Sequence, residues 1–180
     1  GSMTVMSDRI GWSFRSALGA SIPFILAVLG VIVGNIPLSL FGANVPPPML
    51  GLMPIYFWCL VRPDLMPPFA VFIVGVLQDL LSGGAAGVWT LSFIAAYAVV
   101  DRERDSFAGL AGVGAILGFA AAMLIAGASA YAIVSIFYWH LPPVAPILIE
   151  IAISVVFYIP AAFILILIHR RLVGPLRGDF

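Results

Sequence analysis

Two apolar segments of this sequence are joined by Gln78-Asp79-Leu80-Leu81-Ser82-Gly83-Gly84-Ala85-Ala86-Gly87. The three glycines leave almost no loop between the segments, and glycine permits positive φ values and the close approach of helices. We therefore expect a tight hairpin of two helices here. Two interpretations of Asp79 stay open. Its carboxylate accepts hydrogen bonds from amides of the glycine turn or of the next helix, or it lines a pocket or meets a partner chain.

The composition indicates a protein that lies in a lipid bilayer. Hydrophobic residues make up 63% of the 180 residues and charged residues only 9%, whereas a soluble domain carries about 25% charged residues. Lipid removes the need for a polar exterior. The net charge of zero argues against a nucleic-acid partner. The single cysteine, Cys59, excludes an intramolecular disulfide and a CxxC metal site, and we expect no cofactor.

Six apolar segments predict an all-α polytopic membrane protein with about six transmembrane helices in one bundle. They are residues 17–40, 49–61, 67–81, 86–100, 107–137 and 144–168. Prolines separate the second and third segments, and Pro54 interrupts the second, so we expect this region to be kinked or partly re-entrant. The bundle covers residues 16–169, between an N-terminal tail at 1–15 and a C-terminal tail at 170–180. Residues 1–2 precede Met3 and are typical of a cloning scar.

The arginines give this topology a direction. The basic residues are eight arginines, namely Arg9, Arg15, Arg62, Arg102, Arg104, Arg170, Arg171 and Arg177. With six alternating spans they all fall on one side, because the loops at 41–48, 82–85 and 138–143 contain no arginine. The positive-inside rule then places both termini in the cytoplasm. We expect a multi-pass protein of the bacterial inner membrane.

Asp79 and Glu150 are the acidic residues of the predicted spans, and both fall toward the outer face. A carboxylate in hydrocarbon costs a few kcal/mol or more, so such groups usually face a cavity or a partner. For Glu150 an internal hydrogen bond and a pocket or interface are both open. The candidate pocket or partner contacts are Gln78, Asp79, Ser82, Gly83, Gly84, Gly87 and Glu150.

Small residues recur every four positions in the fifth segment, at Gly114, Gly118, Ala122, Ala126 and Ala130. Such a stripe lets another helix approach closely, which is a main means of helix association in lipid. The neighbouring helix belongs to this chain, to a partner or to a second copy. The sequence contains no GxSxG, HExxH or Walker-type motif, so we do not expect an enzyme.

The region around the hairpin resembles a known family. Arg62-Pro63-Asp64-Leu65-Met66-Pro67-Pro68 leads into an apolar segment that ends in the 78–84 stretch and Gly87. With the length, the five or six spans and the short polar tails, this pattern resembles the bacterial rod shape-determining protein family MreD. The local match covers residues 62–100, and the rest of the chain is similar by length and hydropathy only.

The resemblance implies a non-enzymatic component of the machinery that elongates the peptidoglycan wall. Its partners would be MreC, through its membrane helix and adjoining part, together with MreB, RodA and the transpeptidase that works with RodA. The family is also similar in fold to the S components of energy-coupling-factor transporters, which implies an outward-facing pocket that Asp79 and the glycine turn would line. A small-molecule or transport subunit of that kind, or a lipid sensor, is the alternative function.

Overall fold

The computed structural model describes residues 2–36, 47–108 and 112–173, with side chains from residue 17 onward and excluding that of residue 108. Throughout these ranges the regular secondary structure is helical. The predicted all-α class is therefore confirmed for the described residues. The predicted end of the first segment at 40, the arginine-free loop at 41–46 and the tail at 174–180, with Arg177, lie outside the described residues.

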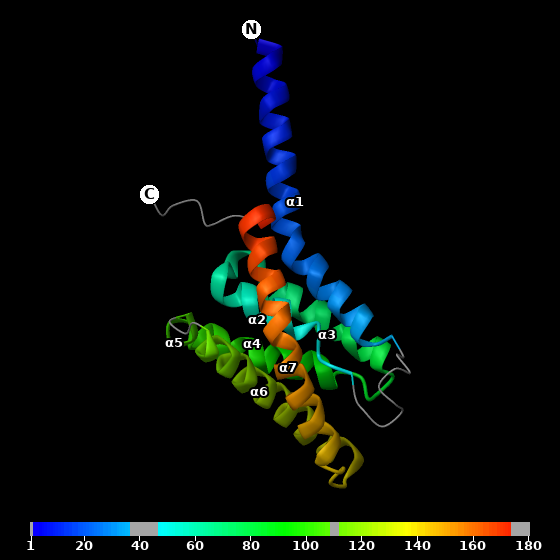
Figure 1. Ribbon diagram of the computed structural model, residues 1–180. Helices are drawn as coiled ribbons and strands as arrows, with labels where there is room; N and C mark the ends of the chain where they lie inside the picture. Colours follow the sequence, from blue (N-terminus) through cyan, green and yellow to red (C-terminus); the bar gives the residue numbers. More distant parts are fainter. Residues whose placement is uncertain (1, 37–46, 109–111, 174–180) are drawn as a thin grey trace.

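The first helix, α1 (Ser2–Gly34), is longer than the apolar segment that predicts it. It runs through the predicted boundary between tail and bundle, and its N-terminal half projects away from the other helices (Figure 1). Pro23 lies inside the helix without ending it. The part from Ala17 to Gly34 is long and apolar enough to cross a membrane.

The second helix, α2 (Leu52–Val61), contains only ten residues, which is a length of about 15 Å. Pro54 is the third residue of this helix, where the backbone N–H has no intrahelical acceptor to lose. The prediction that Pro54 interrupts the segment is therefore wrong, because the helix begins just before it. Residues 52–59 are all buried, so α2 is an internal helix covered by the others.

The hairpin that the sequence predicts is present. A 3₁₀ turn, η2 (Pro63–Leu65), leads to α3 (Pro68–Ser82), and α4 (Val88–Arg102) follows after five residues. The two helices pack closely along their length. At Gly75 an added Cβ would lie 2.7 Å from Thr90 Cα, so only glycine allows this approach.

The predicted fifth segment is divided into two helices. The short α5 (Arg104–Ala108) precedes α6 (Val113–Tyr138), and Gly112 before α6 has a φ of 56°. The predicted span at 107–137 therefore begins later than expected. The last long helix, α7 (Ala145–Ile168), contains Pro160 and continues into a π-helical turn, η3 (His169–Val173).

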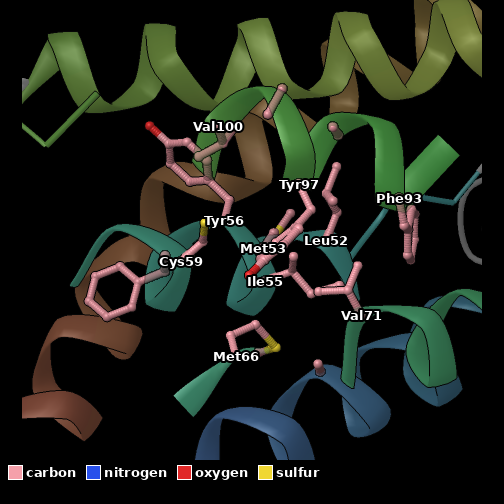
Figure 2. Close-up of a cluster of buried hydrophobic side chains, with 14 of the residues drawn as sticks. Leu52, Met53, Ile55, Tyr56, Cys59, Met66, Val71, Phe93, Tyr97 and Val100 are labelled. Carbon is pink, nitrogen blue, oxygen red and sulfur yellow. The ribbon is translucent and has the colours of Figure 1, made fainter. Parts of the chain in front are cut away.

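The core is built around α2. In Figure 2 its side chains, including Leu52, Tyr56 and Cys59, lie toward Val71 of α3 and toward Phe93, Tyr97 and Val100 of α4. On the other side, Tyr56 contacts the rings of Phe119 in α6 and Tyr158 in α7, with centroids 5.6 Å away in each case. Among the described residues, three helical segments are long and apolar enough to span a membrane, namely Ala17–Gly34 of α1, α6, and α7 with its continuation to Val173. A count of six spans stays a prediction.

Candidate functional site

The candidate site is the junction where α3 ends and α4 begins, with Asp79 at its centre. Helix α3 ends because Gly83 adopts a left-handed conformation with a φ of 70°, and Gly87 does the same before α4 with a φ of 92°. An L side chain rarely adopts these values. The two glycines fold the start of α4 back over the last turn of α3, where the Asp79 side chain lies.

The Asp79 carboxylate caps the N-terminus of α4. Its Oδ1 accepts a hydrogen bond from the Trp89 N–H at 2.8 Å, and its Oδ2 accepts from the N–H groups of Gly87 at 3.1 Å and Thr90 at 3.0 Å. The Thr90 hydroxyl also donates to Oδ2, at 2.5 Å. Asp79 is only 7% exposed. The structural interpretation of Asp79, a carboxylate that accepts amides of the turn and of the next helix, is confirmed.

Gln78, the neighbour of Asp79, links α3 to α1. Its Oε1 accepts a hydrogen bond at 3.0 Å from Asn35 Nδ2, which also donates to the Val31 carbonyl at 2.8 Å. Asn35 was not among the site residues predicted from the sequence. The signal was available, because Asn35 is a polar residue inside the predicted first span. Ser82 contributes locally, since its hydroxyl donates to the Asp79 carbonyl at 3.2 Å.

Glu150 lies away from this junction. It is on α7, one turn before Ser154 and two turns before Tyr158, and these two residues are buried. Ser154 Oγ accepts a hydrogen bond from the Met49 N–H at 2.8 Å, a contact that was not predicted from the sequence. Helix α3 packs on α1 and α4, whereas α7 packs on α6 and α2. Within the described part of the chain no hydrogen bond joins Glu150 to Asp79.

A small cavity lies elsewhere in the described part of the chain. The cavity that the structure records has a volume of about 10 Å³ and lies between α2, α4 and α6, where its lining includes Tyr56, Cys59 and Tyr97. Pockets for small molecules usually measure about 300–1,000 Å³. Neither Asp79 nor Glu150 lines this cavity. Among the described residues, moreover, no three His, Cys, Asp or Glu side chains gather as metal ligands would.

The small-residue stripe of α6 packs inside the chain. Gly118, Ala122, Ala126 and Ala130 are buried, and Gly114 is half-buried. Helix α6 packs on α4 and α7, and a Cβ added at the neighbouring Gly127 would lie 2.9 Å from Ile151 Cδ1 of α7. Of the interpretations left open by the sequence, packing within this chain is confirmed. The four buried positions have no surface left for a partner helix.

Several segments that carry arginine lie close together at the end of α2 that is farther from the Asp79 junction. The Trp58 indole N–H donates to His169 Nδ1 at 3.4 Å, which joins the end of α2 to the end of α7. Phe107 of α5 contacts the ring of Tyr56, with centroids 6.3 Å apart. Helix α1 contacts both η2 and η3. The regions that carry Arg62, Arg104 and Arg170 therefore surround the same end of α2.

Arg62 is fixed at this end by the residue pattern that carries the family resemblance. Its Nε donates to Asp64 Oδ1 at 3.2 Å and its Nη2 to Oδ2 at 2.9 Å. The hydrogen bond from Arg62, assisted by its charge, holds the pKa of the Asp64 carboxyl below its ordinary value. This bidentate pair stabilises the turn between α2 and α3.

In the described part of the chain the fold is all-helical, and the three helices that are long and apolar enough to span a membrane indicate a membrane protein. No protein-family model, no curated protein and no solved structure matches the chain.

Proposed function

We propose that this chain is a non-enzymatic scaffold of the bacterial inner membrane, which supports rod shape and lateral peptidoglycan synthesis by binding MreC and the elongation machinery. The resemblance of residues 62–100 to the MreD family suggests these partners. The proposal includes six membrane segments and both termini in the cytoplasm. The gathering of arginine-bearing segments at one end of α2 supports this orientation.

The observation that supports a scaffold best is that the residues carrying the family resemblance form contacts within the chain itself. The Arg62–Asp64 pair closes the turn before α3, Gln78 binds Asn35, and Asp79 caps α4. These polar groups are engaged by the chain itself. They stabilise the helical framework from within, and so are not needed to bind a ligand.

The surface left for partners is apolar and helical. On α6 and α7 the outward residues include Leu117, Leu124, Phe163 and Ile164, which are 53–72% exposed. A partner's transmembrane helix can pack on such a face without leaving polar groups unpaired in lipid. The S-component-like alternative needs a ligand-sized pocket, and the cavity between α2, α4 and α6, of about 10 Å³, is too small to be that pocket.

Co-purification in detergent tests the proposal. Full-length MreC should be retained by this chain, whereas MreC without its transmembrane helix should be retained poorly. Equal retention of the two forms would contradict binding through helices in the membrane. A chain that retains neither form from the same membranes would refute MreC as the partner.

Crosslinking then locates the interface. In a Cys59→Ser background, single cysteines at Leu117, Leu124 and Phe163 present outward positions, and Ala126→Cys, at 0% exposure on α6, is the matched buried control. We expect a crosslink to MreC from at least one outward position and none from position 126. A crosslinked species of twice the chain's own mass would instead indicate a second copy.

A further inference from the structure

The end of α7 forms a docked corner with α1 and α2. The carbonyl of Leu172 in η3 lies so close to α1 that a Cβ added at Gly19 would be 2.9 Å from it. On the other side, His169 accepts the Trp58 indole N–H at 3.4 Å and contacts the Phe57 ring, with centroids 6.1 Å apart. The π-helical turn is therefore held against two other helices.

Two arginines of this corner point outward. Arg170 and Arg171 are exposed, and within the described ranges neither takes part in a recorded ion pair. Asp64, in the turn after α2, is already paired with Arg62. The corner therefore presents two guanidinium groups without a neighbouring acid among these residues.

Apolar side chains accompany the two arginines. Leu172 is 60% exposed directly after Arg171, and Leu18 of α1, next to Gly19, is 51% exposed. The arginines also lie near the end of the apolar segment Ala145–Val173, where a spanning helix reaches the lipid phosphates. A small water-soluble anion would bind the arginines alone, whereas a phospholipid has a phosphate for the arginines and acyl chains that can contact the exposed leucines. The combination favours a lipid.

We propose that this corner, formed by η3 and the adjoining part of α1, binds the phosphate of an anionic membrane lipid through Arg170 and Arg171. Guanidinium groups match phosphate oxygens in a bidentate geometry. A basic residue near an anionic membrane surface strengthens binding roughly fivefold, so two give roughly 30-fold. This site does not depend on the scaffold function, because any helical membrane protein with this corner would have it.

Lipid titration of the full chain tests the site. The chain in neutral detergent is titrated with phosphatidylglycerol, phosphatidylcholine or inorganic phosphate, and binding is followed by native mass spectrometry and thermal unfolding. We expect binding and stabilisation by phosphatidylglycerol only. Equal effects of phosphatidylcholine would overturn the charge recognition, and an equal effect of inorganic phosphate would overturn the choice of a lipid.

Variants assign the binding to the corner. Arg170→Gln combined with Arg171→Gln should weaken phosphatidylglycerol binding roughly 30-fold, and the corresponding double lysine variant should bind with intermediate strength because it keeps the charge and loses the fork. Arg102→Gln, at an exposed arginine of α4, is the matched control and should bind like the original chain. Unchanged binding by the double glutamine variant, or an equal loss in the control, would refute the site. Melting temperatures in phosphatidylcholine verify that each variant is folded.

Discussion

Replacing Asp79 by asparagine tests whether this carboxylate holds the α3–α4 hairpin. In the structure Oδ2 accepts three donors, from Gly87 and from both groups of Thr90, while Oδ1 accepts only the Trp89 N–H. Asparagine keeps one oxygen and replaces the other by an NH₂ group, which can only donate. Its best orientation places the oxygen at the Oδ2 position. The Trp89 N–H then faces another donor.

The size of the effect follows from the number of donors that lose their acceptor. One buried donor left unsatisfied costs about 1–3 kcal/mol, so Asp79→Asn should lower the free energy of unfolding by about that amount. Asp79→Ala removes the acceptor of three N–H groups and should cost roughly 3 kcal/mol or more. The stability order is therefore the original chain, then Asn, then Ala.

The assay is reversible unfolding in mixed detergent micelles, with the free energy of unfolding compared among variants. Glu150→Gln is the matched control, because it neutralises another membrane carboxylate, one with no recorded hydrogen bond among the described residues. We expect no loss of stability for the control. An Asp79→Asn variant as stable as the original chain, or a control that loses as much, would refute the capping role.

Three further predictions concern packing and pH. Gly75→Ala places a Cβ 2.7 Å from a Cα of α4 and should cost about 1–3 kcal/mol of unfolding free energy, whereas Gly84→Ala, with open space around it, should be nearly neutral. Ala126→Leu overfills a position with 0% exposure and should lower the melting temperature in detergent without MreC present. Because the pKa of Asp64 is lowered in the folded chain, the Asp64 carboxylate stabilises the fold above the ordinary aspartate pKa of about 4, and this stabilisation is lost as the pH falls through the lowered pKa. Melting curves from pH 5 downward should therefore show a small decrease in melting temperature. The Asp64→Asn variant, which keeps Arg62, should not show this decrease.

The hairpin was predictable because its signals are local. Glycines at 83 and 87 permit the backbone conformations of the turn, and an acidic residue eight positions before Gly87 is within reach of the next helix N-terminus. The sequence could not choose between capping and a pocket for Asp79. That choice depends on where α4 begins, and the start of a helix is fixed by packing as well as by local residues.

One error, at Pro54, and one choice that the sequence left open, at the α6 stripe, concern residues that can have opposite meanings. Pro54 breaks a helix in its interior and is harmless in its first turn, and the sequence does not say which turn it occupies. The stripe from Gly118 to Ala130 fits an internal neighbour as well as an external one. Only the contacts of α6 with α4 and α7 distinguish the two.

The placement of polar groups explains how this chain uses helices that are short for a membrane protein. In lipid, each unsatisfied backbone group costs several kcal/mol, and a short helix has as many unsatisfied ends as a long one. Here Asp79 satisfies the start of α4, and Ser154 accepts the Met49 N–H in the segment before α2. Meanwhile α2 itself is covered by protein. Polar side chains at the helix ends therefore allow ten- and fifteen-residue helices to lie within a bundle whose outer surface is formed in large part by the apolar faces of α1, α6 and α7.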